Sequence, residues 1–128
     1  MDFKNKKLIR VVQILFGLYL AFFGVIGYLI TLPAPEYSEA GMAFLGALFS
    51  SGYMFHVMSV IFVLSGLMFL LNKFSAFGAI LLVPITFNIL LFHLFLDMKG
   101  IFIALIPIIL NIYLIYVNLP KYKPMFLK

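Results

Sequence analysis

Long runs of apolar residues, separated by short segments that carry the polar residues and prolines, make up most of the chain. Four runs are long enough to cross a bilayer as helices, since a hydrocarbon core about 30 Å thick requires about 20 apolar residues. We expect the four spans at about residues 8–32, 53–71, 75–95 and 101–118. Helices are predicted rather than strands, because the runs are continuous and lipid requires backbone polar groups to be paired within each segment.

The connections between the runs predict how the spans are arranged. Asn72-Lys73-Phe74 and residues 96–100 are short enough to be tight turns, so spans two, three and four should be antiparallel neighbours. The first connection is longer, starts at a Pro33-Ala34-Pro35 break and contains an apolar helical face at about residues 38–50. Because that segment is too short to span, we expect it at the outer interface or against the bundle.

Composition agrees with a lipid environment. Hydrophobic residues make up 66% of the chain and charged residues only 10%, with a mean hydropathy of +1.21, whereas soluble domains carry about 25% charge. We therefore predict an all-α membrane protein of one domain (residues 1–128). Its fold class is a four-helix transmembrane bundle with a short interfacial helix between helices one and two. The chain has no cysteine, which excludes disulfides, thiolate nucleophiles and zinc–thiolate sites.

Basic residues gather at one set of span ends. With the N-terminus inside, the cytoplasmic basic residues are Lys4, Lys6, Lys7, Arg10, Lys73, Lys121, Lys123 and Lys128, whereas Lys99 lies outside. The acidic residues Glu36, Glu39 and Asp97 also fall outside. Both termini are therefore expected in the cytoplasm. The first run is longer than the core of a signal peptide, so we expect a retained first span. Charges confined to span ends indicate contact with lipid headgroups and not with nucleic acid.

Two amides lie near the expected bilayer midplane. Asn88 and Asn111 each fall within about one helical turn of it, on neighbouring helices. A hydrogen bond between them would contribute on the order of 0.6–2 kcal/mol. One interpretation is a structural bond between helices three and four. The other is the polar base of a pocket for a buried ligand.

A second polar group is expected at shallow depth on the outer side. His56 and His93 lie about one turn inside their spans, and Asp97 follows His93 by four residues, on the same face if the helix continues. Such a group could bind a metal, relay protons or contact a quinone headgroup; equally, histidines often simply lie between apolar and wet layers. The candidate polar pocket therefore comprises His56, Asn88, His93, Asp97 and Asn111, with quinone as a candidate cofactor. No catalytic residue and no metal site are assigned.

Glycine and proline positions predict where helices approach and bend. Gly17 and Gly24 are seven residues apart in the first span, so they share a face on which another helix can pack closely. Pro84 and Pro107 should kink helices three and four. Such kinks either open a pocket or shape the bundle.

Several of these features together resemble the DoxX family of bacterial four-helix membrane proteins. In chain order they are Arg10 before a glycine-containing first helix, Leu64-Ser65-Gly66-Leu67, the Asn72-Lys73-Phe74 turn, Pro84-Ile85-Thr86-Phe87-Asn88, Phe92-His93-Leu94-Phe95-Leu96-Asp97 and Lys121-Tyr122-Lys123-Pro124. The resemblance covers nearly the whole chain, and the P-I-x-x-N-x-x-x-x-H run is its most specific part. Many relatives carry an acidic residue just before the glycine matching Gly66, and this chain has none there.

The resemblance implies a bacterial inner-membrane location and a choice of functions. Some family members are described as subunits of quinone-linked sulfur-compound oxidoreductases or as membrane partners of redox enzymes. For this chain we favour a non-catalytic membrane subunit or scaffold that binds a partner protein or a lipid-like ligand. The alternatives are an accessory subunit of a quinone-linked membrane oxidoreductase and a small transporter. Besides the lipid bilayer, the expected partners are another membrane protein or further copies of the chain.

Overall fold

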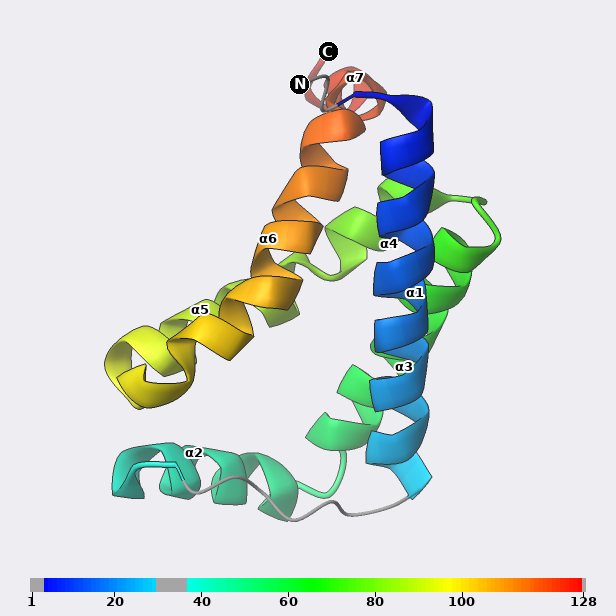
Figure 1. Cartoon of the computed structure of the whole chain (residues 1–128). Helices are drawn as coiled ribbons and strands as arrows, with labels where there is room; N and C mark the ends of the chain where they lie inside the picture. Colours follow the sequence, from blue (N-terminus) through cyan, green and yellow to red (C-terminus); the bar gives the residue numbers. More distant parts are fainter. Residues whose placement is uncertain (1–3, 30–36, 128) are drawn as a thin grey trace.

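The described part of the computed structural model, residues 4–29 and 37–127, is built from helices and contains no strand. The predicted Pro33-Ala34-Pro35 break, Glu36 and Lys128 lie outside these residues. Figure 1 shows the arrangement of the helices. Their bounds are α1 Lys6–Leu29, α2 Glu39–Ser50, α3 Met54–Leu70, α4 Ser75–Leu81, α5 Val83–Phe95, η1 Met98–Gly100, α6 Ile101–Val117, α7 Leu119–Tyr122 and η2 Lys123–Phe126.

The described residues contain three to four candidate membrane spans. Lys6–Ile26, Ser75–Phe95 and Met98–Val117 are each long and apolar enough to cross a bilayer. A fourth span depends on α3, which has 17 residues and meets α2 at a bend of 87°. Large apolar side chains cover the outside of the helices, with Phe102 81% exposed. Because water disfavours such a surface, the apolar helices indicate a lipid bilayer environment.

The closest helix contact is between α1 and α3, and it depends on glycine. A Cβ atom added to Gly17 would lie 2.8 Å from the Gly66 carbonyl oxygen, and one added to Gly66 would lie 2.8 Å from the Gly17 carbonyl oxygen. Gly24 similarly has no room for a methyl group, because the Val63 side chain and the Ser59 carbonyl are too close. The prediction that Gly17 and Gly24 form a packing face is confirmed.

The predicted third span is divided into α4 and α5 at Leu82. Pro84 follows the division and cannot donate the backbone hydrogen bond that would continue the helix, so the helix is interrupted where the sequence predicts a kink. The Ala79 carbonyl, in the turn before the division, accepts a 2.9 Å hydrogen bond from Asn111 Nδ2. Pro107, in contrast, lies inside one continuous α6.

Polar contacts join α1 to the end of α3 and the start of α4. The Arg10 guanidinium donates to the Phe69 carbonyl at 2.8 Å and to the Leu70 carbonyl at 2.5 Å. These are terminal carbonyls of α3, and a cation there also favours the helix dipole. Gln13 Nε2 donates to Ser75 Oγ at 3.0 Å. The α3–α4 connection is the tight turn that the sequence predicts.

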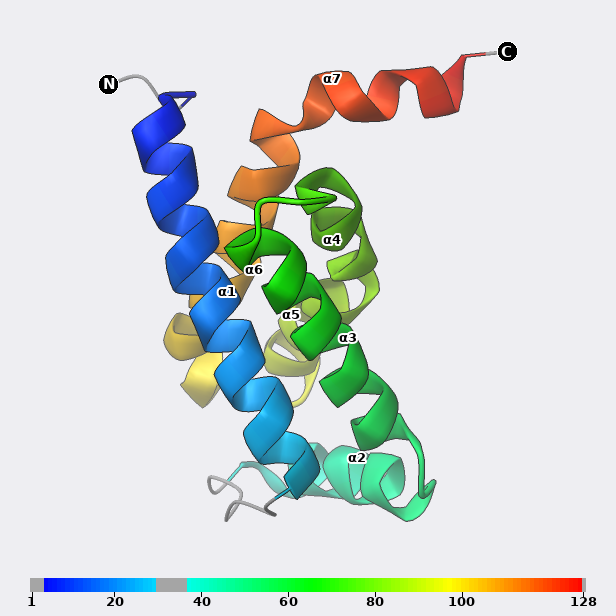
Figure 2. The same ribbon diagram turned by 90° about the vertical axis from the view of Figure 1, so that its right-hand side faces the viewer.

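The described ends of the chain lie at the same end of the molecule. After α6 the chain changes direction, and α7 and η2 run across that end, as Figure 2 shows. Tyr122 OH holds α7 against α4 by donating a 2.6 Å hydrogen bond to the Ala76 carbonyl. At the opposite end, α2 covers nearly the range predicted for the short helix, and Ser38 Oγ accepts the Gly41 N–H to cap it.

Candidate ligand cavity

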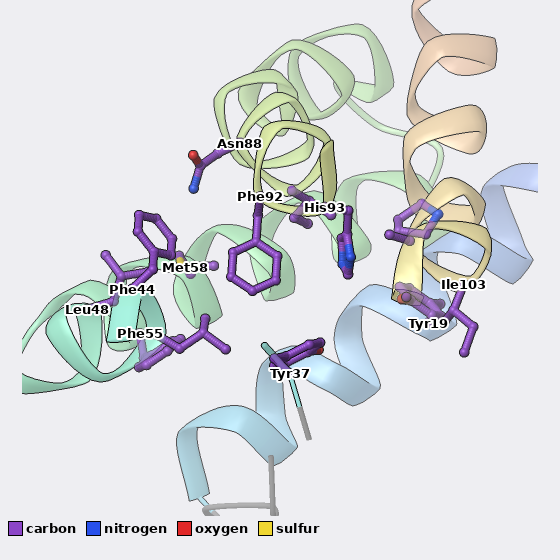
Figure 3. A pocket seen from close by; sticks show the side chains of 15 residues that line it. Tyr19, Tyr37, Phe44, Leu48, Phe55, Met58, Asn88, Phe92, His93 and Ile103 are labelled. Atoms are coloured by element: carbon purple, nitrogen blue, oxygen red, sulfur yellow. The ribbon is translucent and has the colours of Figure 1, made fainter. Parts of the chain in front are cut away.

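A cavity of about 350 Å³ lies between α2, α3, α5 and α6, with Tyr19 of α1 at one side. Figure 3 shows it from close by. We call it the aromatic cavity. Its lining consists of Tyr19, Tyr37, Phe44, Leu45, Leu48, Phe55, Met58, Asn88, Ile89, Phe92, His93, Gly100, Ile103, Ala104 and Pro107.

The helices around the cavity pack against different neighbours. Before the division, α4 packs against α3; after it, α5 packs against α6. Figure 1 shows α5 and the first turns of α6 leaning away from α3, with α2 crossing beneath them. The aromatic cavity occupies the resulting angle between helices.

Apolar and aromatic side chains dominate the wall of the cavity. Phe44 and Phe92 meet with ring centroids 5.8 Å apart, and Tyr37 contacts Phe92 edge to face at 5.3 Å. Asn88 supplies an amide, and His93 supplies an imidazole. A volume of this size, mostly apolar with few polar groups, is typical of a site for a small ligand.

The His93 ring is held in one orientation. Its Nδ1 lies 2.9 Å from the Asp97 carbonyl oxygen, so Nδ1 carries the proton that is donated there. In the neutral ring Nε2 then keeps its lone pair and can accept a hydrogen bond. Gly100 makes room for the ring, since a Cβ atom at that position would lie 2.8 Å from His93 Cε1.

Asp97 is buried next to His93 and connects two parts of the chain. Its Oδ2 accepts the Ser38 N–H at 2.8 Å and its Oδ1 accepts the Lys99 N–H at 3.1 Å. Ser38 Oγ in turn donates to the Leu96 carbonyl. These bonds hold the segment before α2 against the α5–α6 turn. Burial, and secondly the Asp97 charge, raise the pKa of Tyr37 in that segment.

The two predicted midplane amides are not bonded to each other. Asn111 is 1% exposed; its Oδ1 accepts a 2.7 Å hydrogen bond from Thr86 Oγ1, and its Nδ2 donates to Ala79. Asn88 is exposed and lines the aromatic cavity. Residues two positions apart on a helix face different directions, so when Thr86 faces α6, Asn88 cannot. Asn111 is thus a structural contact, and Asn88 a cavity residue.

The predicted outer histidine pair is divided as well. His93 lines the cavity, whereas His56 is an exposed residue of α3 outside the lining. Of the five candidates, the structure therefore brings Asn88 and His93 to the cavity wall, and Asp97 contacts His93 from outside the lining. Within residues 4–29 and 37–127, no three His, Cys, Asp or Glu side chains gather as metal ligands would.

The aromatic residues of the site were not identified from the sequence as site residues. Phe44, Leu45 and Leu48 belong to the apolar face predicted at about residues 38–50, and no sequence pattern distinguishes Tyr37 or Phe55. In a chain with 16 phenylalanines, aromatic residues alone give no signal for a site.

Comparison of the chain with protein-family models, curated proteins and solved structures found no match.

Proposed function

We propose that this chain is a non-catalytic membrane subunit or scaffold that binds a lipid-like molecule in the aromatic cavity. The observation that carries the proposal is the lining, a mostly apolar wall with the Asn88 amide and the His93 imidazole on it. An apolar wall favours binding of the apolar part of a ligand, because that part is removed from water or lipid headgroups. The two polar groups of the wall orient the polar end of the same ligand. The ligand would be an amphipathic molecule with a small polar head.

The proposal includes a topology. In this topology α3 also crosses the bilayer, which makes four spans in total. The short helix α2, which is bent by 87° from α3, lies at the outer interface. Both termini face the cytoplasm because the basic residues gather there. We also propose that the chain is a DoxX-like protein of a bacterial inner membrane, on the sequence features between Arg10 and Pro124. The outer helix surfaces would then be available to a membrane protein partner or a second copy.

A second candidate function is an accessory subunit of a quinone-linked oxidoreductase. The orientation of His93 favours it, since Nδ1 is committed to the Asp97 carbonyl and Nε2 is left as an acceptor. A quinol hydroxyl could donate to Nε2, and the Asn88 amide could donate to a quinone carbonyl. The ultraviolet spectrum of material extracted from the purified protein, with and without borohydride, distinguishes a quinone from other lipids.

Ligand-dependent melting tests the binding proposal. A ligand that binds only the folded protein stabilises it, by about 2.7 kcal/mol at a hundred times its dissociation constant. We expect delipidated protein to melt at a higher temperature when lipid extract from its native membrane is added. Ala104→Phe should abolish the increase, because Ala104 lies in the cavity wall and the new ring would fill the space.

The matched control is Ile106→Phe, which adds a ring to an exposed position of the same helix outside the lining. It should keep the full increase in melting temperature. An equal increase in all three proteins would show that the extract acts on the outer surface, and the proposal would fail.

A further inference from the structure

The last ten described residues form a segment that does not contribute to the aromatic cavity. We call residues 118–127, which include α7 and η2, the C-terminal arm. Asn118 Nδ2 donates to the Leu114 carbonyl at 2.7 Å where α6 ends, and Tyr122 is bonded to the start of α4. The arm is thereby fixed in direction and crosses the end of the molecule, as Figure 2 shows.

The arm exposes consecutive large apolar side chains. Met125 is 65% exposed, Phe126 82% and Leu127 73%. In the α3–α4 turn at the same end, Leu71 and Phe74 are also exposed. Such a row of apolar residues in water would be unfavourable.

Positive charge accompanies these apolar residues. Lys121 and Lys123 of the arm are exposed, as are Lys6 and Lys7 in the first turn of α1 and Lys73 in the α3–α4 turn. The acidic residues of the described part, Glu39 and Asp97, lie at the other end of the molecule. Lysine and large apolar residues on one short segment are typical of polypeptide in the interfacial plane of a membrane.

We propose that the C-terminal arm binds the surface of an anionic phospholipid bilayer. Met125, Phe126 and Leu127 enter the boundary between headgroups and acyl chains, while Lys121 and Lys123 extend to the lipid phosphates. The charge at this end of the molecule is complementary to anionic headgroups and attracts them. The inference rests on the proposed membrane topology and does not depend on the cavity ligand.

A single tryptophan tests this proposal, because the native chain contains none. Phe126→Trp protein is placed in nanodiscs of phosphatidylcholine alone or mixed with phosphatidylglycerol, and quenching by acrylamide is measured. We expect blue-shifted emission and a quenching constant several-fold lower in the anionic discs. Adding Lys121→Gln and Lys123→Gln should remove the difference between the two lipids.

Ile112→Trp is the control, since Ile112 is an exposed residue in the middle of α6. It should be protected equally in both lipids, whether or not the lysines are replaced. The proposal is overturned if the tryptophan at position 126 is quenched as readily as a free indole in both lipids. It is overturned equally if its protection is the same in both lipids and survives replacement of the lysines.

Discussion

Individual atoms decide how closely α1 and α3 can approach. Gly17 and Gly66 face each other, and each would place an added Cβ atom 2.8 Å from the other's carbonyl oxygen. Backbone atoms cannot move aside as the end of a flexible side chain can, so the helices would have to separate. In lipid, packing between helices is a principal source of their association. The packing lost when α1 and α3 separate is therefore not offset by a hydrophobic effect.

We therefore expect Gly17→Ala to destabilise the protein by about 1–3 kcal/mol, as overpacking does in other well-packed interiors. The measurement is thermal or denaturant unfolding in detergent micelles. Gly46→Ala is the matched control, because a Cβ atom there meets nothing within 4 Å. In the middle of α2 it should stabilise by up to about 1 kcal/mol. Equal effects of the two substitutions would contradict the proposed close packing.

At the level of the helices, Asn111 connects α6 to both sides of the division between α4 and α5. Its Nδ2 bonds the Ala79 carbonyl before the division, and its Oδ1 bonds Thr86 after it. One side chain of α6 thus fixes both halves of the divided span. Asn88, on another face of α5, is left for the cavity.

Asn111→Ala should therefore lower the free energy of unfolding by about 1–2 kcal/mol, since two buried partners lose their hydrogen bonds. Asn88→Ala should change it by less than about 0.5 kcal/mol, because its side chain is exposed, yet should weaken the ligand-dependent increase in melting temperature. Unfolding and melting experiments on the same two variants measure both effects. If Asn88→Ala were the more destabilising change, the assigned roles would be reversed.

The sequence predicts the helices better than the contacts between them. Helix positions, the short helix at 38–50 and the interruption before Pro84 follow from local composition and backbone chemistry. The partner of Asn111 does not, because the division at Leu82 and the rotation of α5 decide whether Thr86 or Asn88 faces α6. The sequence predicts His56 and His93 at a similar depth in the bilayer, but depth does not determine which side of its helix a residue occupies. In the structure His93 lines the cavity and His56 lies outside the lining.

At the scale of the whole molecule, charge is separated between the two ends. The basic residues of α1, the α3–α4 turn and the C-terminal arm lie at one end, while Glu39 and Asp97 lie at the other. The proposed topology places the basic end in the cytoplasm, because basic residues near span ends are retained on that side. Lys99 is the exception at the acidic end.

Single cysteines can test this orientation, because the native chain has none. Met98→Cys, in the exposed α5–α6 turn, should react with a membrane-impermeant maleimide added to intact cells. Lys123→Cys should react only after the cells are permeabilised. The reverse pattern would invert the topology, and labelling of both positions in intact cells would show that α6, which lies between them, does not cross the membrane.

Native mass spectrometry of the protein released from lipid discs shows whether the aromatic cavity holds a ligand. We predict that the wild-type chain retains one small lipophilic molecule of defined mass after activation has removed bulk lipid. Ile106→Phe should retain the same mass, and Ala104→Phe should lose it, because only the latter fills the aromatic cavity. If all three chains carry the same adducts, or if none carries a defined one, the cavity is not a ligand site and the account is contradicted.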